Sequence, residues 1–355
     1  MSHLRKRITT ACGWLLADHF ILVLTVVFFL VMWRIYPSMG GARNLANISS
    51  NMWPLLTLVI GQMFVLLVGG IDLSQTSIMA VTSVTGSMIM TLRLDPARFQ
   101  DNPLWGVVLS ESGGLLAGHV LAVPTAVILM LTIGACIGLI NGLAVARLRM
   151  PPFMVTLVTM SFFSGFAIYL TRSENIMHLP ESFIVIGRGG LGPVPYAMMI
   201  AFLTAVAAWT ILNRMVLGRW IYAVGINRKT AVVSGVPCAG VIVAAYVFSG
   251  LCATSAAILY SARLEAGRPT LGQHLLLDVI GAAVIGGISL FGGKGKVRWA
   301  VYGVAFFVVL DNSLNKMPLN FYAVDIIKGA VILMAAVLDV LRNLLSQRSP
   351  ARAGA

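Results

Sequence analysis

The sequence predicts an all-α, polytopic membrane protein with about ten transmembrane helices, two of which are short and interrupted. Hydrophobic residues make up 58% of the 355 residues and charged residues only 10%, which excludes a soluble fold of this length. Apolar stretches of about 17 to 26 residues recur along the chain, and such lengths cross a bilayer as helices. The stretches are continuously apolar rather than alternating, so they favour helices over a β-barrel.

Ten apolar stretches are expected to form the spans. They lie at 16–36, 52–69, 77–92, 115–146, 153–170, 195–213, 238–260, 276–291, 299–315 and 322–340. The first is expected to be a retained helix, because no small-residue cleavage site follows it. The fourth is too long for one perpendicular helix, so it either tilts or begins with a peripheral segment.

Charge predicts the orientation. With ten spans both termini fall on one side, and Lys and Arg predominate in the loops of that side, which the positive-inside rule places in the cytoplasm. This rule also explains the formal charge of +13 better than nucleic-acid binding does, because no soluble domain carries a basic surface. The acids of the loops fall mainly on the other side: Asp95, Asp101, Glu111, Glu174, Glu181 and Glu265.

Two corresponding places combine an acid, glycines and a short span. In the first half Asp72 follows Gly69–Gly70, and in the second half Asp278 enters a glycine-rich apolar run. The spans there measure about 16 residues, or ~24 Å of helix against a ~30 Å hydrocarbon core, so we expect them inside the bundle. Acids between spans are costly, and paired interrupted spans point to a substrate path between repeats. This pattern predicts a transporter rather than an enzyme.

The glycine pairs at 69–70, 286–287 and 292–293 leave two interpretations open. They either permit both close helix approach and non-helical backbone, or they only pack helices against one another.

The loop at 214–237 is basic and amphipathic, with Asn227 at an expected turn or helix cap. Its apolar side is formed by Ile221, Ala223 and Val224, as expected of a surface that a cytoplasmic partner covers. The alternative is a short interfacial helix that lies on the lipid.

These segments resemble the permease subunit of bacterial ABC importers for monosaccharides of the ribose, xylose and galactose type. The family's GGIDLS signature is matched at 69–74, and its G-R-x-x-Y-A-x-G-x-N pattern at 218–227. Further similarities lie at 140–162, at 275–295, at Asn312, Leu314 and Asn315, and at 327–329. The resemblance runs from about residue 44 to 342, within one transmembrane permease domain spanning 1–355.

The resemblance implies a division of labour in the bacterial inner membrane. The permease is expected to be a dimer of two copies or of close paralogues, and not itself an enzyme. A periplasmic binding protein delivers the sugar, and a cytoplasmic ATPase that binds ATP and Mg drives transport, so this chain carries no cofactor. The 214–237 loop is then the element that couples to the ATPase, through Gly218, Arg219, Tyr222, Ala223, Gly225, Asn227, Ser234 and Gly235.

A water-filled path is expected between the two halves, lined by small and polar groups rather than shaped as a tight ligand pocket. The candidate residues are Asp72, Ser74, Ser77, Asn141, Asp278, Ser289, Asn312 and Asn315. Asp72 itself is expected to cap backbone rather than to bind sugar, because a free carboxylate there needs donors.

The chain departs from the family at several positions. Gln62 replaces a residue that is normally small and apolar, Gln75 and Thr76 interrupt the signature, and Lys296 and Arg298 follow the last glycines. These departures leave the architecture intact and the transported sugar or polyol unidentified.

Alternative functions remain open. Asp278, Asp311 and Asp325 could relay protons in an ion-coupled secondary transporter, although Lys328 is expected to neutralise Asp325 on the same helical face. Nucleoside and amino-acid ABC permeases share the architecture. Two apparent nucleotide motifs, at 183–192 and 291–296, lack the required flanking residues, and the histidines show no metal-ligand spacing.

Overall fold

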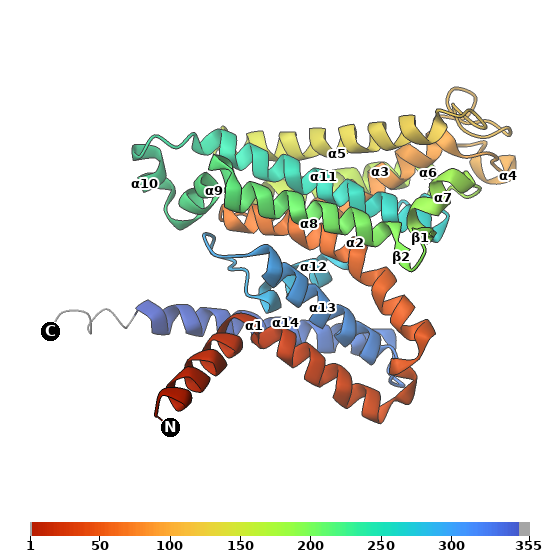
Figure 1. Ribbon diagram of the computed structural model, residues 1–355. Helices are drawn as coiled ribbons and strands as arrows, with labels where there is room; N and C mark the ends of the chain where they lie inside the picture. The colour runs from red at the N-terminus through yellow and green to blue at the C-terminus, as the bar shows by residue number, and fades with distance from the viewer. Residues whose placement is uncertain (1, 348–355) are drawn as a thin grey trace.

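The computed structural model is mostly helical (Figure 1). It describes residues 2–347, and the side chains of residues 19–320, 322–337 and 340. The elements are α1 (Ser2–Ile35), the 3-10 helix η1 (Pro37–Gly40), α2 (Ala42–Leu67), α3 (Gln75–Met90), α4 (Pro96–Phe99), α5 (Ala122–Ala146), α6 (Pro152–Thr171), α7 (Glu181–Arg188), β1 (Gly190–Leu191), β2 (Val194–Pro195), α8 (Tyr196–Arg214), α9 (Val216–Ile226), α10 (Arg228–Val233), α11 (Cys238–Leu264), α12 (Leu275–Gly286), α13 (Val297–Leu314) and α14 (Phe321–Gln347). The two short strands pair antiparallel.

Each predicted span overlaps one of these helices. By length and composition, six helices of the described part could cross a membrane: α2, α5, α6, α8, α11 and α13. Residues 19–35 of α1 and all of α12 form shorter apolar helices. The chain is therefore a mostly helical, multi-pass membrane protein.

The helix that corresponds to the predicted span at 115–146 begins only at Ala122. The preceding residues form turns, because Gly114 and Leu116 donate backbone hydrogen bonds to Thr91 and Ile89 at the end of α3. The predicted fourth span therefore begins with a separate segment before the helix, which is one of the two outcomes expected for a stretch too long for one perpendicular helix.

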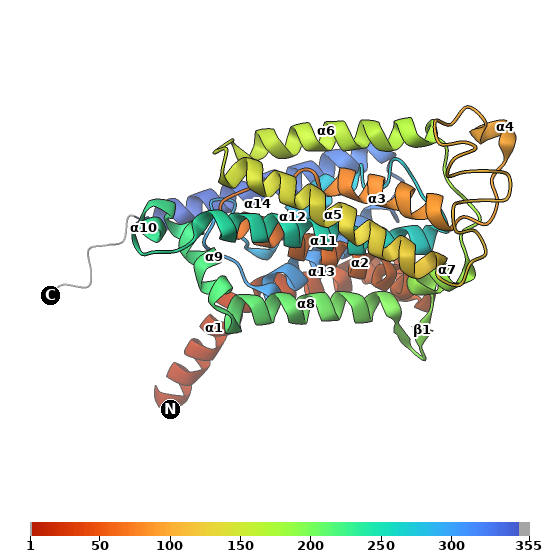
Figure 2. The ribbon, with the colours of Figure 1, turned by 90° about the horizontal axis from the view of Figure 1, so that it is seen from above.

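The helices form two groups (Figure 1). One group contains α2, α3, α5, α6, α8 and α11, and the other contains α1, α12, α13 and α14. The first described residues of α1 and the last of α14 lie at the same end of the molecule as α9 and α10, which we call the α9–α10 end. The opposite end carries α4, α7 and the β-hairpin (Figure 2). The prediction that both ends of the chain lie on one side is consistent with this arrangement, but the terminal residues 1 and 348–355 lie outside the described part.

A stripe of glycines lets α5 approach α11 closely. Gly134, Gly138 and Gly142 recur at every fourth residue of α5. A Cβ at Gly138 would meet the carbonyl of Tyr246, and one at Gly142 would lie 2.8 Å from the Cα of Val243. In a membrane, where lipid competes equally for apolar surface, such close backbone contact is a main source of helix association.

The two predicted short spans are short in the structure. Helix α3 has 16 residues, nearly all of them buried, and α12 has 12 residues that pack between α13, α14 and α2. Both therefore lie inside the bundle as expected, where protein groups can satisfy the irregular backbone beside them.

Candidate functional site

The interruptions after α2 and α12 have the same backbone construction. At the end of α2, Gly69 N–H donates to Leu66 and Gly70 N–H donates to Val65, both at 2.9 Å, with Gly69 at a φ of +80°. At the end of α12, Gly287 takes the same place with a φ of +98°. Both ends are Schellman motifs, which require a left-handed residue that glycine adopts without strain. The glycines at 69 and 287 therefore stop the helices, and non-helical backbone is the correct interpretation there.

The two interruptions meet at one point with the end of α9, which we call the glycine junction (Leu67, Gly69, Gly225, Gly292 and Gly293). Gly293 N–H donates to the carbonyl of Leu67 at 3.0 Å. A Cβ at Gly292 would lie 2.9 Å from the carbonyl oxygen of Gly225 and 3.1 Å from Gly69, and a Cβ at Gly225 would strike the carbonyl of Leu67. Only residues without side chains allow three segments from distant parts of the chain to touch here.

A second contact ties α9 to the second interruption. The Tyr222 hydroxyl donates to the carbonyl of Gly295 at 2.7 Å. Burial raises the pKa of the Tyr222 hydroxyl, so it keeps its proton and this bond at neutral pH. Helix α9 is therefore attached directly to both interruptions.

Asp72 lies just inside the glycine junction, at the centre of a buried network of hydrogen bonds. Its Oδ1 accepts from the backbone N–H of Ser74 at 3.0 Å and from the Ser74 hydroxyl at 2.6 Å, and its Oδ2 accepts from the Ser249 hydroxyl at 2.7 Å. The side-chain Oδ1–Ser74 N–H bond spans two residues, so Asp72 supports the backbone before α3, as predicted.

Two relays of donors end on this carboxylate, and with Asp72 they form the Asp72 network. Thr159 donates to Asn141 at 2.7 Å, and Asn141 donates to Ser74 at 2.8 Å. Gln75 donates to Ser249 at 2.9 Å. The network therefore joins α3, α5, α6 and α11 to the first interruption. Since all of these side chains are buried, each bond replaces one to water that would otherwise be lost.

Gln62 accounts for one departure from the family pattern. In the orientation that satisfies both ends of its amide, Gln62 donates to the carbonyl of Asp72 at 3.0 Å and accepts from the N–H of Asp72 at 3.2 Å. A small apolar residue could not pair with this buried backbone. The side chain therefore holds the main chain of Asp72 while Ser74 and Ser249 hold its carboxylate.

The 214–237 segment folds as α9 and α10, with Asn227 between them. The Asn227 side chain accepts from the N–H of Thr230 at 3.1 Å, which confirms the predicted cap. The expectation for the apolar side is wrong, because Ile221 and Val224 are buried against the protein itself. The exposed large apolar residues of the segment are instead Met215, Val216, Ile226, Val232 and Val233, with Val233 89% exposed.

The other predicted coupling residues divide in the same way. Gly218 is buried, Tyr222, Ala223 and Gly225 are half-buried, and Arg219, Asn227, Ser234 and Gly235 are exposed. Gly218 and Gly225 therefore serve packing, while the exposed residues remain available to a partner.

Among the candidate path residues, the structure brings Asp72, Ser74 and Asn141 together. Ser77 lies beside them and donates to the carbonyl of Ser74 at 2.8 Å. Ser289 lies in the second interruption, where its hydroxyl accepts from the N–H of Phe291 at 3.2 Å. Whether substrate passes these residues stays a prediction.

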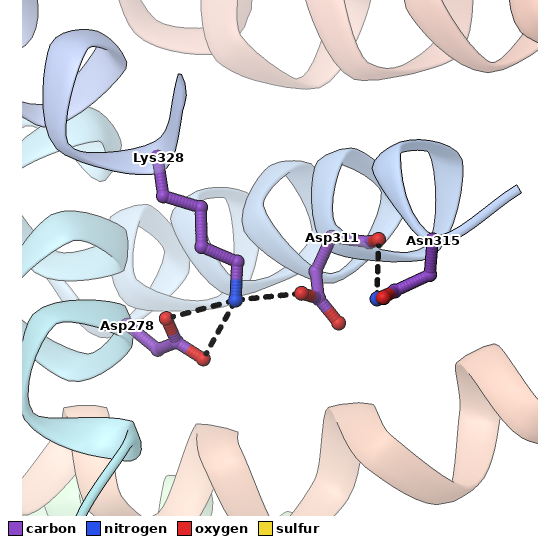
Figure 3. Close-up of polar contacts among 4 residues, drawn as sticks. All are labelled: Asp278, Asp311, Asn315 and Lys328. Carbon is purple, nitrogen blue, oxygen red and sulfur yellow. Dashed lines mark hydrogen bonds and ion pairs between the residues drawn. The ribbon is translucent and has the colours of Figure 1, made fainter. Parts of the chain in front are cut away.

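Asp278 is not beside Ser289 but near the other end of α12, where it forms an ion cluster with Asp311 and Lys328 (Figure 3). The Lys328 ammonium lies 2.6 Å from Asp311 and 3.3 Å from Asp278, and the Asp278 and Lys328 side chains are only 13% and 11% exposed. The expected Lys328–Asp325 pair is wrong, because Lys328 pairs instead with Asp278 of α12 and Asp311 of α13. The cluster joins α12, α13 and α14.

Asn312 and Asn315 have local partners. Asn312 is buried and exchanges two hydrogen bonds with Asn44 of α2, at 3.0 and 3.2 Å. Asn315 is exposed and donates to the backbone carbonyl of Asp311 at 2.8 Å. Asn141, Ser289 and Asn312 are all buried and hydrogen-bonded in this structure, and the water-filled cavity between the halves stays a prediction.

The sequence reasoning missed Ser249, Thr159 and Asn44 as members of these contacts. The available signal was a polar residue inside an apolar run, which in a membrane requires an internal partner. Within the described residues, no group of three or more His, Cys, Asp or Glu is arranged to hold a metal ion.

One family model and several known permeases are similar to this chain. A family model described as branched-chain amino acid transport system / permease component matches residues 44–336. The ribose import permease protein of Bacillus subtilis is 32% identical over 305 residues, which cover 85% of this chain and 86% of the relative. The D-allose transport system permease protein of Escherichia coli is 29% identical over 79% of this chain and 78% of its own length. The L-arabinose ABC transporter permease protein of Azospirillum brasilense is 26% identical over 91% and 87%. No solved structure gives a significant match.

Proposed function

The chain belongs to the family described as branched-chain amino acid transport system / permease component, and we propose that it is the permease subunit of an ATP-binding cassette importer for a monosaccharide or related polyol. The observation that carries the substrate class is the set of relatives named for ribose, allose and arabinose, which align with most of this chain. An amino-acid substrate is the second candidate, because the description of the family itself favours it.

The proposed topology has ten spans in the inner membrane, with both termini cytoplasmic. The overlap of each predicted span with a helix supports the number of spans. The excess of basic residues on the α9–α10 side supports the orientation, although the side chains of Arg5, Lys6 and Arg7 and those of residues 342–352 lie outside the described part.

The proposed partners are a cytoplasmic ATPase, which binds ATP and Mg, a periplasmic sugar-binding protein, and a second permease copy or paralogue. The ATPase is proposed to dock on the exposed side of α9 and α10. Ile226, Val232 and Val233 supply apolar surface there, and Arg219 and Lys229 supply charge.

The attachment of α9 to both interruptions supports a route for coupling. A displacement of α9 by the ATPase acts directly on Gly295 through Tyr222 and on Leu67 through Gly225. Leu67 ends α2, and Gly295 lies in the non-helical segment between α12 and α13, so both contacts act where helical hydrogen bonding has stopped. The two interruptions therefore move together, as alternating access between two halves requires.

Uptake into vesicles tests the function. Vesicles that contain the permease, its ATPase and its binding protein are expected to take up ribose, allose or arabinose only with ATP, and to continue when an uncoupler collapses the proton gradient. Uptake that needs no nucleotide and stops with the uncoupler would support a secondary transporter instead. Uptake of a branched-chain amino acid, with none of the sugars, would support the second candidate.

A further inference from the structure

A pocket of about 420 Å³ opens at the α9–α10 end, between the ends of α2, α5, α6, α9 and α11. Apolar side chains line part of it, with Val68, Val145, Met150, Val224 and Ile242 among them, and polar groups line a comparable part. Its polar groups define what it can bind.

Two arginines line the pocket. Arg149 lies between α5 and α6, and Arg228 begins α10. Arg228 donates one hydrogen bond, to the carbonyl of Ala146 at 3.4 Å, and no carboxylate of the described residues forms an ion pair with either guanidinium. Most N–H groups of these two guanidiniums therefore have no acceptor within the described part of the protein.

The backbone at Arg149 adds a second observation. Its φ of 57° lies in the left-handed region, which is strained for an arginine. The chain accepts this strain at a residue that lines the pocket, two positions before Pro151.

The third polar group is the Tyr246 hydroxyl. Tyr246 is fully buried, it lines the pocket, and its hydroxyl has no hydrogen-bond partner within the structure. A buried hydroxyl without a partner is unfavourable, so a ligand that accepts a hydrogen bond from it is stabilised.

We propose that this pocket binds a phosphate group carried on a small organic body. Two guanidinium groups and one hydroxyl offer donors from three segments, which suits a group with three or more acceptor oxygens better than a carboxylate with two. The apolar side chains receive the organic body, and the volume is in the range of small-molecule sites. An anionic phospholipid headgroup and a soluble phosphate ester share this chemistry.

Two probes distinguish the sources. Phosphatidylglycerol, with phosphatidylcholine as its zwitterionic comparison, is added to the delipidated permease and its retention is measured by native mass spectrometry. Glycerol 3-phosphate, with glycerol as its neutral comparison, is titrated against the thermal midpoint of the permease in nonionic detergent. Selective binding of the first identifies a lipid, and binding of the second identifies a soluble ester.

The double variant Arg149→Gln/Arg228→Gln is expected to weaken whichever probe binds by tenfold or more, which corresponds to about one charge-assisted hydrogen bond or more. Tyr246→Phe should weaken it less. Arg147→Gln is the matched control, since Arg147 is exposed on the same loop and does not line the pocket. If neither probe binds the wild-type protein, or if the double variant binds like the wild type, the proposal is wrong.

Folding of the double variant is checked by circular dichroism. If it does not fold, the conservative Arg149→Lys/Arg228→Lys variant replaces it, and binding to the wild-type protein is measured against salt concentration. Binding through two arginines must weaken as salt rises, and binding that does not depend on salt would overturn the proposal.

Discussion

The carboxylate of Asp72 receives three hydrogen bonds while its own backbone is held by Gln62, so one residue is fixed at both its main chain and its side chain. Its partners come from two helices as well as from its own segment. Removing such an acceptor leaves several buried donors unpaired at once, and this costs more than the hydrogen bonds themselves contribute.

We expect Asp72→Asn to be milder than Asp72→Leu. Asparagine keeps the size and one acceptor oxygen, so a loss of about 1 kcal/mol is expected, whereas leucine leaves the N–H and hydroxyl of Ser74 and the hydroxyl of Ser249 without an acceptor and should cost about 3 kcal/mol or more. The thermal midpoint of the purified permease in detergent measures the difference. Asp101→Leu, on an exposed loop, is the control and should change little. Equal losses for the two Asp72 variants would show that the carboxylate is not the centre of the network.

Individual side chains also show which contacts the sequence could predict. The Asn227 cap depends on a neighbour three residues away, so the local pattern predicted it. The Asn44–Asn312 pair spans 268 positions, and no local pattern contains that information. Lys328 was assigned to Asp325 by helical spacing, but packing of α12 and α13 against α14 presents Asp278 and Asp311 to it instead.

At the scale of elements, the ion cluster of Asp278, Asp311 and Lys328 joins three helices of the second half (Figure 3). Two carboxylates and one ammonium group carry a formal charge of −1. The cluster is largely buried, so the lysine serves to compensate two acids that could not remain charged in apolar surroundings alone.

Lys328→Met should be the most destabilising change in this cluster. It leaves two acids uncompensated, and breaking a buried ion pair costs about 3–5 kcal/mol. Asp311→Asn should cost about 1 kcal/mol or less, because Asp311 is 33% exposed and Asp278 still pairs with Lys328. The thermal midpoint again measures both, with Lys316→Met as the exposed control.

The double variant Lys328→Met/Asp278→Asn sharpens this test. It removes the most buried uncompensated acid and should be more stable than Lys328→Met alone. A Lys328→Met protein as stable as the wild type would mean that the cluster does not hold the three helices together.

Hydropathy predicted the helices well, because a span of apolar residues is decided by local composition. It could not predict which side of α9 faces outward. The pattern of Ile221, Ala223 and Val224 correctly identified an apolar side, yet that side packs on the permease itself. An amphipathic pattern shows that a surface is covered and does not show what covers it, so the proposed docking side rests instead on which residues the structure leaves exposed.

At the scale of the whole molecule, the 214–237 segment contains two kinds of residue. Some pack inside the permease at the glycine junction, and others are exposed on α10, where a partner could bind. Gly225 touches Leu67 and Gly293 inside the permease, whereas Val233 lies almost fully exposed on α10. A bulky residue at 225 therefore disturbs the permease before any partner binds. A crosslinker intended for the ATPase belongs at 233 rather than at Tyr222, which is half-buried and bonded to Gly295.

We therefore expect Gly225→Val and Val233→Asp to fail in different ways. Gly225→Val should lower the thermal midpoint of the isolated permease, because its side chain meets backbone that cannot move aside. Val233→Asp should leave that midpoint nearly unchanged, because a substitution at an exposed position changes the free energy of unfolding by about 0.5 kcal/mol or less. It should nevertheless weaken association with the cytoplasmic ATPase about tenfold or more and reduce transport-stimulated ATP hydrolysis, because it places a charge in an apolar docking surface.

Val107→Asp is the matched control, because Val107 is 77% exposed in the irregular segment between α4 and α5, outside α9 and α10. If Val233→Asp binds the ATPase as the wild type does, or if Val107→Asp weakens binding equally, the ATPase does not dock on this side of α9 and α10.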